Sequence, residues 1–420
     1  SVIQQSFPES GESISAFGWV GISFSQPMKK STVEAAFSLS PEVDGAFIWQ
    51  GEAFWFRPIH PYALGVEYQA VLSGELETAE GKTVSVEHAW TFKIRESALI
   101  FFVPQQEGGE IWRARSGGTQ PQQLSHTGGK VIDFVTNRTG SQIAYTVQNE
   151  VGGRDLWVLD REGQNAQMLI HCARDVCDEP SWSMDQEWIA YTRNIYHAES
   201  EGHLPSQVWT VEVESGETAQ LYQSDIAYGH SPSFSPNGKK LATYDSNHDA
   251  IRVLDLETSQ ESMIPREIPG SGDWSPDGSK MLLTDIVPAE NEPFVVIYVV
   301  DLADELVETA FDTALTDTDF SQPRWSPDGE WVAVSLRAVN AAPSKSLWLL
   351  NLDGEQVLPV VEEPSSTYSA YQWDPWGERL IYQRFELGRS EDNTSIWIWD
   401  WETQENTLII ENGARPQWLP

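Results

Sequence analysis

The chain lacks several things that common functions require. It has 26 Lys and Arg against 63 Asp and Glu, so the formal net charge of its 420 residues is −37. Nucleic-acid recognition and docking on anionic membrane surfaces both depend on clustered basic side chains, so this balance rules out most nucleic-acid binding and argues against such docking. No run of 18 apolar residues is present, so we expect no membrane span in this chain.

Cysteine is scarce, because Cys172 and Cys177 are the whole supply. Their close spacing favours a disulfide that pins one loop, and a metal clip or a redox pair is the alternative. The His residues show no metal-ligand spacing, so we expect no metal and no cofactor. Asp317 and Asp319 lack the rest of a calcium loop and are expected to be solvated acids.

Signals for export and for catalysis are also missing. No basic segment is followed by a short apolar stretch, so we expect any export signal or anchor to lie outside this chain. The chain has no G-x-S-x-G motif, no Walker loop, no dinucleotide fingerprint and no Asp box of the form S-x-D-x-G-x-x-W. These absences argue against the commonest catalytic sites.

Tryptophan, by contrast, is abundant and periodic, since 19 Trp exceed 16 Phe and 12 Tyr. A strand that ends in an aromatic residue is followed by a tight turn and a second apolar strand, as at Asp273–Gly278 and Arg324–Gly329. Related segments recur every 40 to 52 residues, a period typical of propellers and solenoids. The aromatic anchors are Phe134, Trp182, Phe234, Trp274, Trp325, Trp373 and Trp418.

The repeated turn, Ser-Pro-Asp-Gly, predicts its own local structure. Pro presets φ at the first central position, Asp can bond its own backbone, and Gly takes the positive φ that closes the hairpin. The Trp before the turn is large enough to fill the wedge between neighbouring sheets. Four short strands per unit predict a β-propeller in which these turn residues are structural and not catalytic.

The repeat resembles the WSPDG repeats of TolB-like propellers, and also the propeller domain of prolyl oligopeptidases and dipeptidyl peptidases. The resemblance covers about residues 98–420 and implies the propeller fold. In those peptidases the Ser nucleophile lies on a separate α/β-hydrolase domain, for which no residues remain after the repeats. We expect seven blades over residues 97–420, with the strand at Trp418 completing the first blade. Six blades is the alternative, if the unit at Phe134 is miscounted.

Residues 1–96 show short strands separated by Gly and Pro, which predict a β-sandwich. Segments Ile22–Met28, Phe54–Pro58, Leu64–Tyr68 and Trp90–Phe92 resemble, in order, the bacterial Ig-like domains of surface and secreted proteins. That resemblance implies a spacer or adhesive module without chemistry of its own. The expected fold class is therefore all-β, with an Ig-like sandwich at 1–96 and a propeller at 97–420.

The candidate binding surface is the propeller face that carries the longer loops, at 148–154, 194–207, 287–293, 338–345 and 385–395. Function gathers on loops that a rigid scaffold displays. Charged residues stand where the second strand of successive blades leaves for this face, so they could ring the mouth of a central channel. Solvated strand ends are the alternative. The candidates are Arg193, Asp245, Asp285, Arg337 and Arg384.

These features predict an exported, non-enzymatic bacterial protein of the cell envelope or cell surface. Its propeller would bind a protein or glycan partner, within a larger surface assembly. The alternative is a propeller-fold glycan hydrolase or lyase that uses carboxylates at the channel mouth. The excess of acid needs no cationic ligand to explain it, because high net charge keeps a β-rich protein soluble.

Overall fold

A computed structural model describes residues 2–105, 108–222, 228–288, 293–304, 306–311, 318–339, 341, 343–352, 355–388 and 394–420. The chain divides into two compact units, Ser1–Ala98 with Pro420, and Leu99–Leu419. Across the described residues the one α-helix is α1 (Lys30–Ala36). None of the described chain forms a helix that is both long and apolar enough to cross a membrane.

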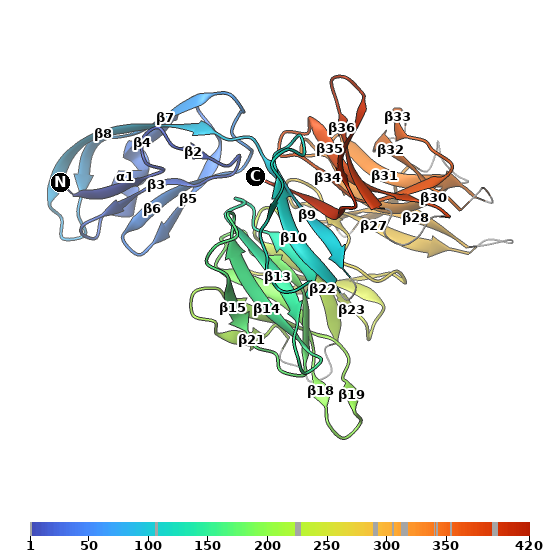
Figure 1. Cartoon of the computed structure of the whole chain (residues 1–420). Coiled ribbons are helices and arrows are strands. Elements are labelled where there is room, and N and C mark those ends of the chain that lie inside the picture. The colour runs from blue at the N-terminus through green and yellow to red at the C-terminus, as the bar shows by residue number, and fades with distance from the viewer. Residues whose placement is uncertain are drawn as a thin grey trace. The chain divides into compact units, whose positions relative to one another are not determined.

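The first unit is a sandwich of two four-stranded sheets, in the orders β1-β3-β6-β5 and β2-β8-β7-β4 (Figure 1). Alternate residues of β6 and β8 face the core, so Phe54, Phe56, Trp90 and Phe92 are buried, as the two-residue period of a strand requires. The predicted β-sandwich is confirmed. The strands are β1 (Ile3–Phe7), β2 (Ser13–Ile14), β3 (Val20–Phe24), β4 (Phe37–Ser40), β5 (Gly45–Gln50), β6 (Ala53–Pro58), β7 (Glu67–Glu77) and β8 (Thr83–Ile94).

In the second unit, the described strands form seven four-stranded blades, so the predicted seven-bladed propeller is confirmed (Figure 1). Blade 1 contains β38 (Ala414–Leu419), β9 (Ala98–Gln105), β10 (Gly108–Ala114) and β11 (Gln122–Gln123). Blade 2 contains β12 (Val131–Thr136), β13 (Gln142–Gln148), β14 (Arg154–Asp160) and β15 (Gln167–Ile170). Blade 3 contains β16 (Val176–Trp182), β17 (Trp188–Asn194), β20 (Gln207–Glu212) and β21 (Thr218–Gln220). Between β17 and β20 a small hairpin is inserted, β18 (Tyr196–His197) and β19 (Gly202–His203).

The remaining blades follow the same order from inner to outer strand. Blade 4 contains β22 (Gly229–Phe234), β23 (Lys240–Asp245), β24 (Ala250–Asp255) and β25 (Glu261–Pro265). Blade 5 contains β26 (Asp273–Trp274), β27 (Lys280–Val287), β28 (Phe294–Asp301) and β29 (Leu306–Thr309). Blade 6 contains β30 (Thr318–Trp325), β31 (Trp331–Ala338), β32 (Ser346–Asn351) and β33 (Val357–Val361). Blade 7 contains β34 (Ser366–Trp373), β35 (Arg379–Glu386), β36 (Thr394–Asp400) and β37 (Asn406–Glu411).

The ring closes through the two ends of this unit, because β38 pairs with β9 in blade 1 as expected. The anchoring Trp side chains then hold neighbouring blades together. The indole N–H of Trp182 donates to the Val135 carbonyl of blade 2 at 3.4 Å, and that of Trp418 donates to the Gln372 carbonyl of blade 7 at 3.1 Å. These large side chains fill the wedge between two blades, and Trp182 and Trp418 also bond across it.

The repeated turn forms as predicted. In the turn after β30, the Ser326 hydroxyl donates to the Asp328 carboxylate, which also accepts the N–H of Glu330 at 3.0 Å. Gly329 has a φ of +75°, a conformation that glycine adopts without a Cβ penalty. The acids of these turns are thus committed to local hydrogen bonds.

The predicted anchor of blade 2, Phe134, is wrong. Thr136 pairs with Ile143, in the register that joins Trp182 to Ile189 in blade 3. The N–H of Asn137 also bonds the Gln142 carbonyl, five residues on, as at the other turns. Because this copy lacks Trp at the anchor position, the nearest aromatic residue was mistaken for it.

Candidate functional site

The long-loop face, defined as the face that carries the connections from second to third strand and from each blade to the next, gathers most of the charged contacts. Antiparallel pairing places the start of an inner strand beside the end of the second strand. Cys177 therefore lies opposite Arg193, Gly229 opposite Asp245 and Asp319 opposite Arg337. Parts of the loops after β27, β31 and β35 lie outside the described residues.

Arg193 and Arg384 make matching contacts in blades 3 and 7. Arg193 binds Asp175 at 2.7 Å, and its guanidinium lies 4.9 Å from the ring centroid of Trp209. Arg384 binds Glu363 at 2.5 Å and lies 5.4 Å from the ring centroid of Trp397. In both blades the acid belongs to the connection that enters the blade, so the arginine ties that connection to the second and third strands.

Blade 6 corrects one expectation, because Asp319 is not a solvated acid. It is 7% exposed, and its carboxylate binds Arg337 at 2.8 Å and Lys345 at 3.2 Å. Burial acts to raise the pKa of Asp319, but hydrogen bonds from Arg337 and the Val295 N–H, with the charge of Lys345, hold it below its usual value. Asp317, the other acid of this pair, lies outside the described residues.

The two acidic candidates have different surroundings. Asp245 is 1% exposed; it accepts two hydrogen bonds from Arg252 and lies 3.1 Å from His248. These contacts outweigh burial and lower the pKa of Asp245. Asp285 is half-buried, and its carboxylate accepts the Glu267 N–H at 3.0 Å. Each of the five predicted residues thus has a described partner in or beside its own blade, and a ligand-binding role for them stays a prediction.

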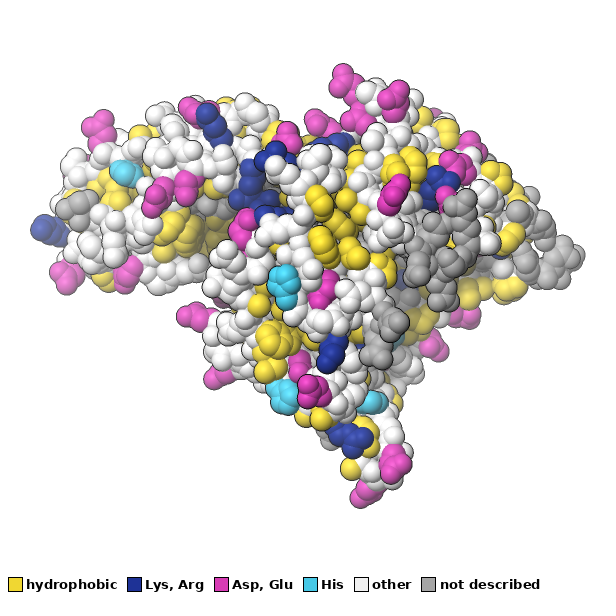
Figure 2. Space-filling view, in the orientation of Figure 1, with side chains coloured by type: hydrophobic (Ala, Val, Ile, Leu, Met, Phe, Trp, Pro, Cys, Tyr) yellow, Lys and Arg dark blue, Asp and Glu magenta, His cyan; other side chains and the backbone are white. Residues whose placement is uncertain are grey.

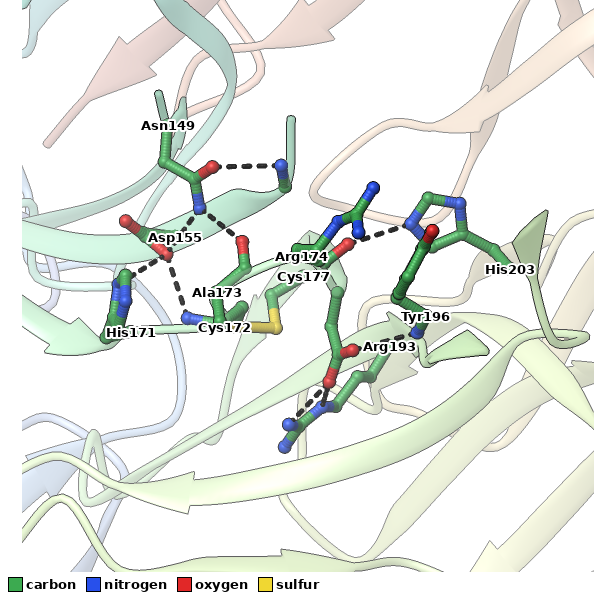
Figure 3. Close-up of a disulfide and its surroundings, with 12 residues drawn as sticks. Asn149, Asp155, His171, Cys172, Ala173, Arg174, Cys177, Arg193, Tyr196 and His203 are labelled. Carbon is green, nitrogen blue, oxygen red and sulfur yellow. Dashed lines mark hydrogen bonds and ion pairs between the residues drawn. A yellow bond between two sulfur atoms is a disulfide. The ribbon is translucent and has the colours of Figure 1, made fainter. Parts of the chain in front are cut away.

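The disulfide loop, residues 172–177, is a second element of this face (Figure 3). The Sγ atoms of Cys172 and Cys177 are bonded, and both side chains are buried. The carboxylate of Asp155 accepts the Cys172 N–H at 2.8 Å, and the side-chain amide of Asn149 donates to the Ala173 carbonyl at 2.7 Å. A covalent bond and hydrogen bonds from blade 2 therefore fix the same short loop.

The inserted hairpin, residues 195–204 with β18 and β19, extends away from the blades (Figure 1). Its contacts at the base go to the disulfide loop (Figure 3). The Arg174 guanidinium lies 3.8 Å from the ring centroid of Tyr196, and the Arg174 carbonyl lies 2.9 Å from Nε2 of His203. The Tyr196 N–H donates to Asp175 at 2.8 Å. The disulfide loop thus positions the hairpin.

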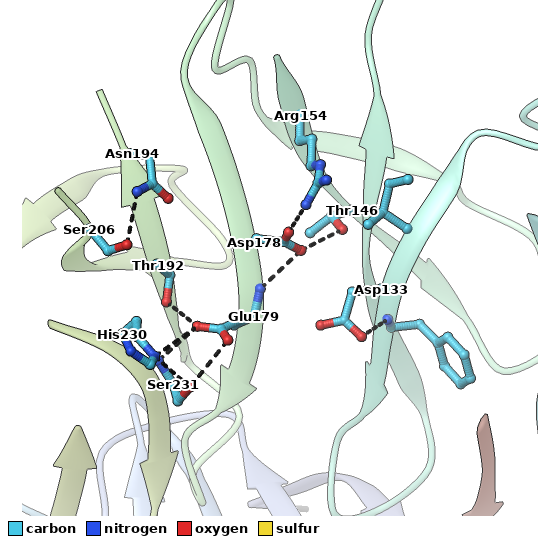
Figure 4. A network of polar contacts seen from close by, with 12 residues as sticks. Asp133, Thr146, Arg154, Asp178, Glu179, Thr192, Asn194, Ser206, His230 and Ser231 are labelled. Atoms are coloured by element: carbon cyan, nitrogen blue, oxygen red, sulfur yellow. Dashed lines mark hydrogen bonds and ion pairs between the residues drawn. The ribbon is translucent and has the colours of Figure 1, made fainter. Parts of the chain in front are cut away.

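A polar network joins the inner strand of blade 3 to blades 2 and 4 (Figure 4). Arg154 on β14 and the Thr146 hydroxyl on β13 both bind the carboxylate of Asp178. The next residue, Glu179, accepts the N–H of Ser231 on β22 at 2.7 Å and the Thr192 hydroxyl at 2.7 Å. Together the two acids hold the inner strand of blade 3 to both neighbouring blades.

In the same region, the side chain of Asp133 has a raised pKa. Burial raises the pKa of Asp133, the charge of Arg415 opposes that shift, and the nearby carboxylate of Asp178 adds to it. Arg415 also binds the Asp133 carboxylate directly. A raised carboxyl pKa is one property of a general acid, but this carboxylate is held by a guanidinium.

The described residues contain no metal centre, and their acidic side chains do not gather into one patch on the face shown in Figure 2. In the described part of the chain, no group of three or more His, Cys, Asp and Glu is placed to hold a metal ion. Asp and Glu side chains are spread over many elements on the face shown in Figure 2. On this face the negative charge of the acids is therefore distributed over the surface and does not form one binding patch.

Sequence reasoning missed the bulged residues of the inner strands, which lie three positions before the anchor. They adopt left-handed backbone conformations, with φ between 49° and 53°, and the first four of the residues named below lie next to breaks in strand register. A Pro follows four of them, and that recurrent Pro was the available signal. Bulges of this kind re-aim side chains near functional sites. The residues are Glu179, Ser231, Gln322, Ala370 and Arg415.

Comparison with known proteins establishes the fold and no more. No family model matches the chain, and no curated protein matches it. Similar solved structures include the β-propeller domain of the Trilobed protease from Pyrococcus furiosus, at 14% identity and a TM-score of 0.52, with 83% of this chain and 94% of that chain covered. That propeller has an open velcro topology, whereas here β38 pairs with β9.

Two further structures are similar at comparable identity. The acylaminoacyl peptidase of Pyrococcus horikoshii is 14% identical with a TM-score of 0.52, and 82% of this chain matches 50% of that one. TolB from Acinetobacter baumannii is 17% identical with a TM-score of 0.44, with 77% and 82% covered. At 14% identity, the likeness to the two Pyrococcus structures shows the β-propeller fold alone.

Proposed function

We propose that this protein is an exported, non-enzymatic binding protein of the cell envelope or cell surface. The long-loop face of its propeller engages a protein or glycan partner, and the sandwich, as an Ig-like module, serves as a spacer. Membership of a larger surface assembly belongs to the same proposal. The observation that carries it is the hairpin at residues 195–204, which extends from this face on a disulfide-fixed base.

The physical argument is preorganisation. A loop that must be ordered on binding loses conformational entropy, and this loss subtracts from affinity. Here Tyr196 and His203 are already fixed by Arg174 and Asp175. Arg174 and Asp175 themselves lie between the two bonded cysteines. An element held this firmly can present its side chains to a partner at little entropic cost.

The alternative, a glycan hydrolase or lyase, needs two carboxylates of which one stays protonated. Asp133 and Asp178 are the pair with the nearest properties, because burial raises the pKa of Asp133 and Asp178 contributes to that shift. However, Asp133 is bound by Arg415 and Asp178 by Arg154. Because both carboxylates are already engaged by guanidinium groups, neither is free to contact a glycan, which favours binding over acid–base chemistry.

The test is co-precipitation from native envelope extract after light crosslinking. The wild type is compared with a variant in which residues 196–203 are replaced by Gly-Gly, and with Glu214→Gln, an exposed residue of the turn between β20 and β21 on the opposite face, as control. We expect one partner to be retained by the wild type and the control and lost by the hairpin variant. Equal recovery by the hairpin variant contradicts the proposal, as does a protein recovered alone that cleaves a glycan panel.

A further inference from the structure

The opposite face of the propeller carries a pair of Trp rings at the edge of a buried cluster of blades 6 and 7, against which Trp331 packs. The rings of Trp331, at the start of β31, and Trp401, after β36, lie edge to face with centroids 5.4 Å apart. Trp401 is 37% exposed and also contacts the ring of Trp399 at 5.6 Å. Both residues border the short turns, so this surface is separate from the long-loop face and independent of the function proposed for it.

The repeats supply an internal comparison for Trp331. In blades 4, 5 and 7 the same position holds Lys240, Lys280 and Arg379, since each carbonyl accepts an N–H from the turn residue five positions earlier. In blade 2 it holds Gln142 and in blade 3 it holds Trp188, by the same hydrogen bond. Four blades therefore fold with a polar or basic residue there, and blade 3 shares the Trp of blade 6.

The same comparison applies to Trp401. Its N–H donates to the carbonyl of Glu378, at the start of the second strand of its blade. Leu256 in blade 4 and Leu302 in blade 5 make the equivalent bond, to Lys239 and Ser279. A leucine therefore satisfies this position in two other blades, and the indole of Trp401 adds an aromatic surface beyond what the turn needs.

The surroundings of the pair favour a cation. Glu330 precedes Trp331, Glu402 follows Trp401, and these two side chains and that of Glu378 are all exposed. Elsewhere the propeller places its own arginines over rings, as with Arg193 over Trp209 and Arg379 over Trp418. Among the described residues, no Lys or Arg lies over Trp331 or Trp401 in this way.

We propose that the Trp331–Trp401 pair is a docking site for a lysine or arginine side chain of a basic segment on a protein partner. The ring faces attract the cation through their quadrupoles, and Trp is the strongest of the aromatic residues in this respect. The three glutamates and the overall charge of −37 raise the local concentration of a basic segment and speed its approach. Charge thus brings the segment to the surface, and the rings select its position.

The test uses a fluorescein-labelled peptide of alternating Lys and Ser, with a Glu-Ser peptide of the same length as the comparison probe. The double variant Trp331→Gln with Trp401→Leu places in each position the residue of another blade, and it leaves the net charge unchanged. Leu256→Ala is the control, because Leu256 is 40% exposed at the position equivalent to Trp401. Fluorescence anisotropy gives the affinity of each protein for each peptide.

We expect the double variant to bind the Lys-Ser peptide about fivefold more weakly than the wild type, as an exposed cation–ring contact implies, and Leu256→Ala to bind as the wild type does. Unchanged binding by the double variant overturns the proposal, and so does equal binding of the Glu-Ser peptide. If the double variant does not fold, the single variant Trp401→Leu is used instead, and we expect it to bind the Lys-Ser peptide about twofold more weakly than the wild type. A wild-type dimer that Trp401→Leu abolishes in sedimentation would assign the surface to a second copy and overturn the basic partner.

Discussion

The guanidinium of Arg193 reaches one carboxylate oxygen of Asp175 with two nitrogens, Nε at 2.9 Å and Nη2 at 2.7 Å. The other oxygen of that carboxylate accepts the Tyr196 N–H at 2.8 Å. One acid therefore links the disulfide loop, the second strand of blade 3 and the inserted hairpin. Loss of the Asp175 carboxylate contacts would therefore loosen the loop, the strand and the hairpin together.

Arg193→Met keeps an apolar stem over Trp209 and removes the charge that Asp175 faces. Since both partners are mostly buried, with exposed fractions of 23% and 15%, we expect a loss of about 1–2 kcal/mol in the free energy of unfolding. Lys280→Met is the matched control, because its pair with Asp301 is longer, at 4.0 Å, and more exposed. Urea denaturation measures the free energy of unfolding of both variants. Equal losses would contradict a special stabilising role for the Arg193–Asp175 pair.

Removal of the disulfide by Cys172→Ala with Cys177→Ala tests its effect on the hairpin. The cysteines are five residues apart, and so short a closed loop contributes about 2 kcal/mol through the unfolded chain. The loop also loses its covalent base, so cleavage after Tyr196 by a limiting amount of chymotrypsin should become faster. Cleavage at the wild-type rate would show that the hydrogen bonds from Asn149 and Asp155 hold the loop without the disulfide.

The buried acid of blade 6 predicts a dependence of stability on pH. The pKa of Asp319 is lowered in the folded protein, so its stabilising effect is complete above the unfolded value of about 3.9 and is lost as the pH falls through the lowered pKa. Asp319→Asn should therefore be less stable than the wild type at pH 7, and the difference should shrink below about pH 4. Urea unfolding at pH 7, 5 and 3 checks this. A difference that is constant across that range would exclude the charge as its cause.

The anchors between blades can be ranked by substitution of Trp182, which is 6% exposed. Trp182→Ala leaves a cavity between blades 2 and 3 and should cost about 3–5 kcal/mol. Trp182→Phe keeps most of the packing but loses the bond to the Val135 carbonyl, at about 1 kcal/mol plus the smaller ring. Chemical denaturation compares them with Trp401→Leu, for which we expect under about 0.5 kcal/mol as a surface change.

The fold followed from the sequence because each blade repeats the same local chemistry. The Pro, Asp and Gly of the turn and the Trp before it act within a few residues, so their roles could be inferred without tertiary information. The error at Phe134 arose in the one copy where Thr136 replaces the aromatic anchor. Although this repeat lacks the aromatic anchor, its first two strands pair in the same register as those of the other blades.

The site was predictable only in part. The charges at the ends of the second strands were visible, but their partners lie on connections between blades, as Asp175 and Glu363 do. Asp319 was expected to be solvated because nothing in the nearby sequence shows that Lys345 approaches it. Such pairs join a connection or inner strand to a later segment of the same blade, and composition or period cannot reveal them.

The pairing of β38 with β9 fixes the order in which the ring can be completed. Strands β9, β10 and β11 are synthesised before the other six blades, yet their inner partner β38 is made after every other described strand. Until then the free edge of β9 exposes unpaired backbone groups, to which a strand of another chain can pair and so start aggregation. The edge of β9 is therefore the part of the nascent propeller that most needs protection from aggregation until β38 has been synthesised.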